Sequence, residues 1–327
     1  MSSKLWFLFL MIFSSTAFSD PIVIKFNHVV AQDTPKGKAA LKFKELAENY
    51  TDKAVLVEVY PNSQLFKDRE ELEALQMGVI QMAAPSVSKF GPLGIRDFEI
   101  FDLPYLFMNK EEVHEVTDGV IGKRLFDKLE EKGLLGLAYW DNGFKHFSAN
   151  RPLKKIRDFR GLRMRIQSSK VIEATFRSLR ASPQVMAFSE AYTAMQQGVV
   201  DGSENSVSNL YTQKMHEVQS NLTLSHHGYL VYAVVTNRDF WQSLPSEIRK
   251  KLDKALEDAT IYERQLALDE NELALQAIRD LGKTEIYELP LHEKSKWRER
   301  LRGVHKKFER VVGSKNLKDV YSITSKN

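Results

Sequence analysis

The sequence predicts an α/β protein made of two successive α/β units crossed by one long helix, and three observations carry this prediction. Residues 22–84 alternate short apolar strands with amphipathic helices in the order β-α-β-α-β, the alternation that builds a parallel sheet with helices on its faces. Residues 134–205 follow the same order without an obvious residue-level repeat. Residues 246–281 keep an amphipathic helical pattern over 36 positions, or about 54 Å of helix.

The composition fits one large or two medium globular domains and excludes several other classes. The chain has 327 residues, of which 43% are apolar and 28% are charged, and it contains no Cys. Without Cys there is no disulfide scaffold, no thiol nucleophile and no thiolate metal site. The 47 basic and 43 acidic residues nearly balance, at a net charge of +4. The sequence therefore lacks the strongly basic surface that nucleic-acid binding requires.

The N-terminus has the three-part pattern of a cleaved export signal. Lys4 gives a positive start, residues 5–13 form an unbroken apolar run, and Ala17-Phe18-Ser19 supplies small residues before a cut at Ser19-Asp20. The run of nine residues is shorter than the about 20 that a membrane-spanning helix needs. We therefore expect residues 1–19 to be a signal peptide and the mature protein to be exported.

The first unit carries polar loops at the ends of its strands. We expect strands over residues 22–26, 55–59 and 79–84, and helices over residues 39–50 and 70–77. Ligands on parallel sheets bind outside the carboxyl ends of the strands. Those ends carry Asn27-His28, Asn62-Ser63 and Ser86-Val87-Ser88.

The second unit ends on a polar segment of the same kind. We expect strands over residues 134–140, 161–166, 184–187 and 199–202, an extended stretch over 147–150, and helices over 170–179 and 190–197. The last strand presents Ser203-Glu204-Asn205, and strand alternation puts Arg163 and Arg165 on one face.

The C-terminal third is predicted to be mostly helical. Pro245-Ser246 opens the long helix and Gly282 ends it. Its apolar spacing is not the clean heptad of a coiled coil, so we expect a strut that lies across both units. A second helix is expected over residues 287–303, followed by a polar and frayed tail.

No catalytic or phosphate-binding motif stands out. The sequence has no Gly-x-Gly-x-x-Gly, no phosphate loop and no Gly-x-Ser-x-Gly elbow. The adjacent His226 and His227 would point to opposite faces of a strand, and no carboxylate pair has a spacing suited to acid/base work. We expect no metal site, no cofactor and no enzyme activity, so the pattern points to a binding protein.

An ordered set of motifs gives the sequence a specific resemblance. The motifs are KFNHVVAQDTPKG at residues 25–37, FDLPYLF at 101–107, DNGFK at 141–145, FRGLRMRI at 159–166, SPQVMAFSEAY at 182–192 and QQGVVDGSEN at 196–205. Together they resemble the solute-binding proteins of tripartite ATP-independent periplasmic (TRAP) transporters, in their DctP-type, C4-dicarboxylate branch. The resemblance covers essentially the whole mature chain.

The resemblance implies a two-lobed periplasmic binding protein fold that closes on an organic acid and delivers it to the membrane permease subunits. Lobe I is expected to comprise residues 20–142 and about 231–270, and lobe II residues 143–230 and about 271–327. A hinge and the long helix would join the lobes. We expect a periplasmic monomer.

The resemblance also implies which residues hold the acid. Arg165 matches the arginine that pairs with the ligand carboxylate, because a guanidinium offers paired donors to two carboxylate oxygens. Asn205 matches an amide that bonds ligand oxygens, and Phe188 matches an aromatic ring beside the ligand. Glu204 and Arg163 are expected behind these residues, with Glu204 bracing an arginine.

Six further residues are candidates for the second ligand carboxylate and its surroundings. Lys145 stands where some sialic-acid binders carry a second arginine, and Ser86 stands where those binders carry a glutamate. A lysine at residue 145 and the absence of a carboxylate at residue 86 would both favour a ligand with two carboxylates. Lys145 is expected to face the cleft. The others lie beside predicted loops at the sheet ends: His28, Lys36, Arg69 and Ser88.

Two classes of function follow. The first is the capture of a C4-dicarboxylate such as malate, succinate or fumarate, or, in the same role, of a keto acid, a sugar acid or an aromatic acid. The second is an exported hydrolase or lyase acting on such acids, which would need a base positioned beside a reacting atom.

Overall fold

The computed structural model describes residues 20–324 and has the two-lobed α/β architecture that the sequence predicts. The expected signal peptide, residues 1–19, lies outside the described residues. None of the helices described is long and apolar enough to cross a membrane.

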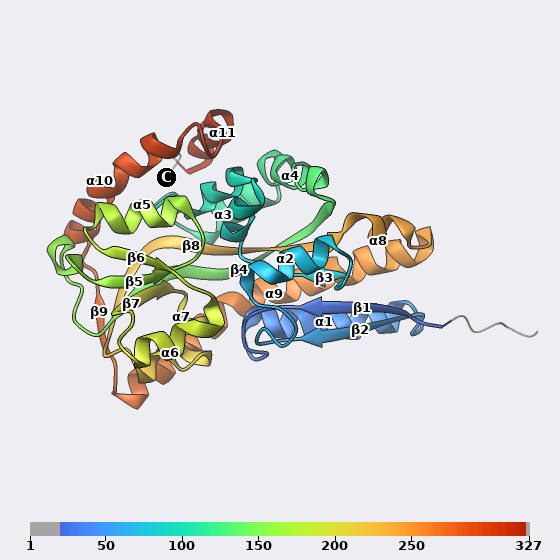
Figure 1. Ribbon diagram of the computed structural model, residues 1–327, viewed down its shortest axis with the longest axis horizontal. Helices are drawn as coiled ribbons and strands as arrows, with labels where there is room; N and C mark the ends of the chain where they lie inside the picture. The colour runs from blue at the N-terminus through green and yellow to red at the C-terminus, as the bar shows by residue number, and fades with distance from the viewer. Residues whose placement is uncertain (1–19, 325–327) are drawn as a thin grey trace, which may run out of the picture.

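A single sheet of nine strands runs through both lobes (Figure 1). Its order is β2-β1-β3-β8-β4-β7-β5-β6, with β9 beside β8. The strands are β1 Ile22–Asn27, β2 Val55–Tyr60, β3 Met82–Ala83, β4 Leu134–Ala149, β5 Arg163–Ile166, β6 Ser182–Val185, β7 Gly202–Asn205, β8 Asn221–Asn237 and β9 Glu285–Glu288. With the lobe boundaries that the sequence analysis expects, strands β1 to β3 fall in lobe I and β5 to β7 in lobe II, whereas β4 and β8 run across the boundary.

Two long strands join the units that the sequence pattern separates. Strand β4 has 16 residues and β8 has 17, and the two pair antiparallel with register shifts at Asp141/Gly143 and Lys145/Phe147. These bulges keep turn-type residues within one strand, so the predicted break after Trp140 is wrong. The sequence analysis does not predict β8, although residues 229–235 form an unbroken apolar run after the polar residues 225–228.

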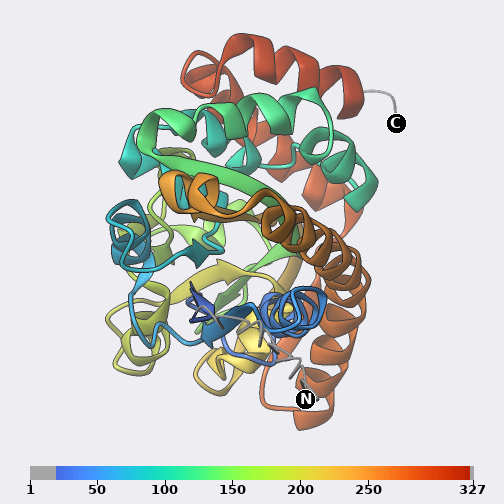
Figure 2. The same cartoon turned by 90° about the vertical axis from the view of Figure 1, so that its right-hand side faces the viewer.

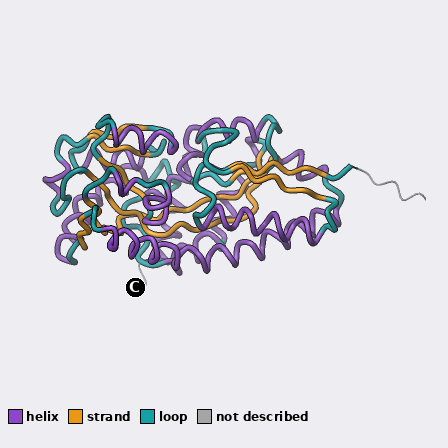
Figure 3. Tube along the Cα trace, turned by 90° about the horizontal axis from the view of Figure 1, so that it is seen from below, coloured by secondary structure: helices purple, strands orange, loops and turns teal. Residues whose placement is uncertain are grey.

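Helices cover the strands on the outside of an elongated molecule (Figure 3). They are α1 Pro35–Tyr50, α2 Asp68–Gln76, α3 Lys110–Thr117, α4 Val120–Asp127, α5 Lys170–Ser178, α6 Ala191–Gln196, α7 Val207–Thr212, α8 Arg238–Ser243, α9 Ser246–Leu281, α10 Leu291–Phe308 and α11 Ser314–Thr324. Short 3₁₀ helices near the candidate site are η1 Val87–Leu93, η2 Arg96–Asp102 and η5 Phe188–Glu190.

The long helix is confirmed with the ends that the sequence predicts. Helix α9 has 36 residues and stops at Gly282, which adopts the left-handed conformation. Its Leu252 and Leu256 pack into the core of lobe I, and its Ala274 and Ile278 pack beneath α6 and α7 of lobe II. The helix passes α1 on its way (Figure 2), so it is a strut across both lobes.

The C-terminal end differs from the sequence prediction. Residues 285–288 form strand β9, parallel to β8, and α10 begins only after Pro290, which cannot sit inside a helix. The expected frayed tail contains helix α11. Its Leu317 and Val320 are buried in the main core, so packing orders a segment whose composition is polar.

Candidate functional site

A small cavity lined by both charged and apolar side chains lies between the lobes, where strand ends and helix starts from both halves meet. Its volume is about 20 Å³, room for a single water molecule. The lining residues are Val29, Val30, Asp68, Ser86, Lys89, Arg165, Gln167, Phe188, Asn205, Asn209, Leu230 and Tyr232. Four of the expected ligand residues therefore come together here, namely Arg165, Asn205, Phe188 and Ser86.

Arg165 is held in place by the backbone of its own lobe. On β5 its neighbours Met164 and Ile166 enter the core, so Arg165 points to the other face. Its Nε and Nη2 donate to the carbonyl oxygen of Met186 at 3.1 and 2.8 Å. The Phe188 ring centroid lies 5.6 Å from the guanidinium carbon. Burial lowers the pKa of Arg165, and Asp68 partly offsets this effect.

The sequence analysis overlooks a second buried cation on the cavity wall. Lys89, in η1, is 5% exposed and pairs with Asp68 and with Glu71, the latter at 3.3 Å. Burial opposes the charge of this lysine, but the two carboxylates outweigh burial and raise its pKa. Burial alone would raise the pKa of Asp68, whereas Lys89 and Arg165 hold it at about 2. The cavity thus has a charged group from each lobe.

Two hydrogen-bonded amide side chains, those of Asn205 and Asn209, form another part of the cavity wall. The Oδ1 of Asn205 accepts hydrogen bonds from the Ser206 backbone N–H at 3.0 Å and from Asn209 Nδ2 at 3.1 Å. Asn209 also donates to the Tyr232 hydroxyl at 3.0 Å. Because the oxygen of Asn205 is engaged, its amide nitrogen is the group able to donate to a ligand oxygen.

Lys145, which the sequence analysis expects to face the cleft, is not among the residues that line this cavity. Its Nζ lies 2.8 Å from Glu204 and 3.7 Å from Asp102, and all three side chains are 2–3% exposed. Glu204 also bonds His227 Nε2 at 2.7 Å, so it braces a lysine and a histidine, not Arg165. Burial would raise the pKa of Glu204, but Lys145 and His227 lower it to about 2.

Lys145→Met is therefore expected to destabilise the fold. Removing one partner of a buried pair leaves carboxylates uncompensated and costs about 3–5 kcal/mol. Urea unfolding of the unliganded variant measures this loss, and adding Glu204→Gln should recover part of it. If Lys145→Met leaves the unfolding midpoint unchanged and selectively weakens diacid binding, Lys145 contacts the ligand and its role is not structural.

Two of the expected arginines lie on the surface. Arg69 has a side chain that is 76% exposed and pairs with Glu73, one turn further along α2. Arg163 pairs with Asp201 at 2.8 Å and is 48% exposed. Because these groups are solvated and already paired, the structure gives neither a place beside Arg165.

Three other candidates are buried behind the cavity wall. Lys36 donates to the carbonyl oxygen of Ala84 at 2.8 Å and lies 3.7 Å from the centroid of the Tyr232 ring, and burial lowers its pKa to about 7. His28 is fully buried, and burial lowers its pKa to about 3. Ser88 donates to Asp102 at 2.7 Å and accepts from Ser86 at 3.2 Å. These residues support the wall and do not line the cavity.

Asp102 makes stability depend on pH. Burial raises its pKa to about 6, although Lys145 opposes this shift. Between about pH 4 and 6 the folded state holds a proton that the unfolded chain releases, so this stabilisation is lost as the pH rises. From pH 4.5 to pH 7, we expect the wild type to lose on the order of 2 kcal/mol relative to Asp102→Asn in urea unfolding. Parallel pH profiles would contradict this expectation.

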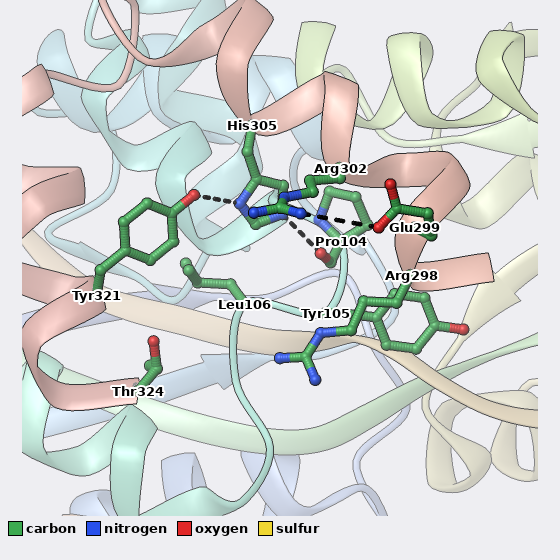
Figure 4. Close-up of a pocket in the computed structure, with 9 residues that line it drawn as sticks. All are labelled: Pro104, Tyr105, Leu106, Arg298, Glu299, Arg302, His305, Tyr321 and Thr324. Carbon is green, nitrogen blue, oxygen red and sulfur yellow. Dashed lines mark hydrogen bonds and ion pairs between the residues drawn. The ribbon is translucent and has the colours of Figure 1, made fainter. Parts of the chain in front are cut away.

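A larger hollow, of about 490 Å³, lies elsewhere, between α10, α11 and residues 104–106 (Figure 4). His305 bridges its wall by bonding the Tyr321 hydroxyl and the Pro104 carbonyl oxygen, both at 2.7 Å. Its two arginines, Arg298 and Arg302, are exposed to solvent. None of the expected ligand residues lines this hollow. Among residues 20–324 no three His, Asp or Glu side chains form a group that could hold a metal ion.

Comparison with known proteins places this architecture in a family. Residues 26–311 match the bacterial extracellular solute-binding protein family 7, DctP. The chain is 58% identical over 312 residues to the C4-dicarboxylate-binding periplasmic protein DctP of Rhodobacter capsulatus, covering 95% of this chain and 94% of that protein.

Two solved structures share the fold over nearly their full length. A TRAP periplasmic solute-binding protein from Shewanella oneidensis, with bound succinate, is 41% identical with a TM-score of 0.91, covering 93% of this chain and 99% of that one. Another from Pseudomonas aeruginosa, with bound L-malate, is 40% identical with a TM-score of 0.85, covering 88% and 100%. The chain therefore belongs to the DctP family of TRAP transporter solute-binding proteins.

Proposed function

We propose that the protein captures a C4-dicarboxylate in the cavity between its lobes and delivers it to the permease of a TRAP transporter. The observation that carries this proposal is the pair of buried cations on one small cavity, Arg165 from lobe II and Lys89 from lobe I. The relatives with bound succinate and L-malate support a diacid.

The chemistry of a dianion explains why two cations are needed. Arg165 can hold one carboxylate through paired N–H donors. Burying a second carboxylate without a partner would be prohibitive, and Lys89 supplies that partner from the facing lobe. The amide nitrogen of Asn205 then offers a donor to a remaining ligand oxygen, and Ser86 lines the same cavity.

Movement of the lobes is part of the proposal, because the cavity as it stands is too small for a four-carbon diacid. We propose the lobe boundaries given by the resemblance, residues 20–142 with about 231–270 and residues 143–230 with about 271–327. The lobes would separate about β4, β8 and α9 to admit the acid and then close. Small-angle scattering should show a smaller radius of gyration on adding the acid, and an unchanged radius at saturation would contradict hinge closure.

The cellular setting is proposed with the function. Cleavage at Ser19-Asp20 would release a periplasmic monomer, and the protein would act by binding, with no chemical change to its ligand. Recovery of unaltered acid after prolonged incubation tests this point, whereas a new product would favour the enzyme alternative.

A thermal-shift screen of organic acids tests the proposed ligand class. A bound ligand stabilises by RT ln(1 + [L]/Kd), so succinate, L-malate and fumarate should raise the melting temperature well above the effect of butyrate. A shift with galactonate or an aromatic acid and none with the C4 diacids would contradict the proposal in favour of another acid.

A further inference from the structure

Asp68 links the two lobes beside the cavity. It is the first residue of α2 in lobe I, and its Oδ2 accepts a hydrogen bond of 2.6 Å from the backbone N–H of Phe188, the first residue of η5 in lobe II. Its Oδ1 pairs with Lys89 of lobe I. One carboxylate therefore joins the buried cation of one lobe to the backbone of the other.

The segment that Asp68 holds is the one on which Arg165 rests. Arg165 donates twice to the carbonyl oxygen of Met186, and its guanidinium lies near the Phe188 ring. Residues 186–188 are thus hydrogen-bonded by Arg165 within lobe II and by Asp68 from lobe I. Opening the lobes must break the bond from Phe188 to Asp68, while the pair of Asp68 with Lys89 stays within lobe I.

An ion pair next to Asp68, between the same two elements, allows the expected strength of the Asp68–Phe188 hydrogen bond to be compared with that of an exposed contact. Lys67 pairs with Glu190 at 3.0 Å, but these side chains are 49% and 51% exposed. The side chain of Asp68 is only 16% exposed. Exposed ion pairs contribute little, whereas hydrogen bonds to a shielded charge are among the stronger ones.

We propose that Asp68 is a latch that positions residues 186–188 and holds the lobes closed over the bound acid. This inference rests on the proposed function for its ligand, a C4-dicarboxylate. A positioning role for Asp68 and a simple effect of its charge predict opposite changes in ligand binding when Asp68 is removed. As a negative charge on the cavity wall, Asp68 repels a dianion, so charge alone predicts that its removal strengthens binding. A latch predicts that its removal weakens retention.

The test compares Asp68→Asn and Asp68→Ala with the wild type and with Lys67→Met, which removes the exposed pair beside the latch. For succinate, stopped-flow fluorescence should give an association rate within a few-fold of the wild type and a dissociation rate at least about 10-fold faster in the Asp68 variants. Lys67→Met should change dissociation less than two-fold. Equal or slower dissociation in the Asp68 variants would overturn the latch.

Amide hydrogen exchange gives a second readout that needs no ligand, because the unliganded lobes also close part of the time and the bond to Asp68 then shields the Phe188 amide. The Phe188 amide should exchange faster in Asp68→Ala, which removes the acceptor of its hydrogen bond, than in the wild type, while amides of α5 in lobe II stay unchanged. Equal exchange at Phe188 would overturn the latch even if succinate fails to bind. If the wild type does not bind succinate but Phe188 exchange still differs between the variant and the wild type, only the proposed ligand is contradicted.

Discussion

Arg165→Ala is expected to lose most of the affinity for a C4-dicarboxylate while the unliganded protein remains folded. Truncating one partner of a buried, hydrogen-bonded charge pair costs about 2–5 kcal/mol, or roughly 30- to 4,000-fold in Kd. In the unliganded protein Arg165 bonds only one carbonyl oxygen, that of Met186, among the described residues. Calorimetric titration with succinate measures the loss, and urea unfolding checks the fold.

Arg165→Lys separates charge from geometry at the same position. An ammonium keeps the positive charge but cannot present the two-pronged donor of a guanidinium, so affinity should recover only in part. Wild-type affinity in Arg165→Ala would remove Arg165 from the ligand site. Full recovery in Arg165→Lys would mean that charge alone decides binding.

Lys89→Met is expected to reduce the preference for diacids over monoacids. The variant is made together with Glu71→Gln, because Lys89 also pairs with Glu71, which is fully buried. Losing the partner of the second carboxylate should weaken succinate by about 2 kcal/mol, or roughly 30-fold. Butyrate, which lacks that carboxylate, should change little. The ratio of the two Kd values is the measurement.

Glu71→Gln alone is the matched control for this pair. It removes the buried carboxylate and keeps the lysine, so the preference for succinate over butyrate should persist. Because Lys89 also pairs with Asp68, its removal could weaken the binding of both acids through the latch. The role of Lys89 toward the second carboxylate is therefore measured by the ratio of the Kd values for succinate and butyrate. Equal losses for succinate and butyrate in the double variant would contradict the role of Lys89.

The motifs that carry the family resemblance predict the part of the site that lies on single strands and their ends. The alternation around Arg165 fixes its face on β5, and Asn205 ends the strand β7 that the sequence places nearby. Phe188 and Ser86 follow strand ends in the same way and also reach the cavity. Strand periodicity and strand ends are short-range properties, so a sequence pattern carries them.

Long-range pairing decides the rest of the site, which is why the sequence does not give it. Lys145 follows a bulged stretch of β4, and the register shift at Lys145/Phe147 accompanies a side chain that meets Glu204 and Asp102 in the interior. Tyr232 sits on β8, a strand that the sequence analysis does not predict. Lys89 reaches the cavity through the pairing with Asp68 and Glu71 from another helix.

A crystal structure of the succinate complex tests the central claim most directly. We predict one acid between the lobes, with one carboxylate on the guanidinium of Arg165 and the other within hydrogen-bond distance of Lys89 Nζ. The Asn205 amide nitrogen should donate to a ligand oxygen. Succinate bound in the hollow of Figure 4, or held in the cavity without contact to Arg165, would contradict the claim.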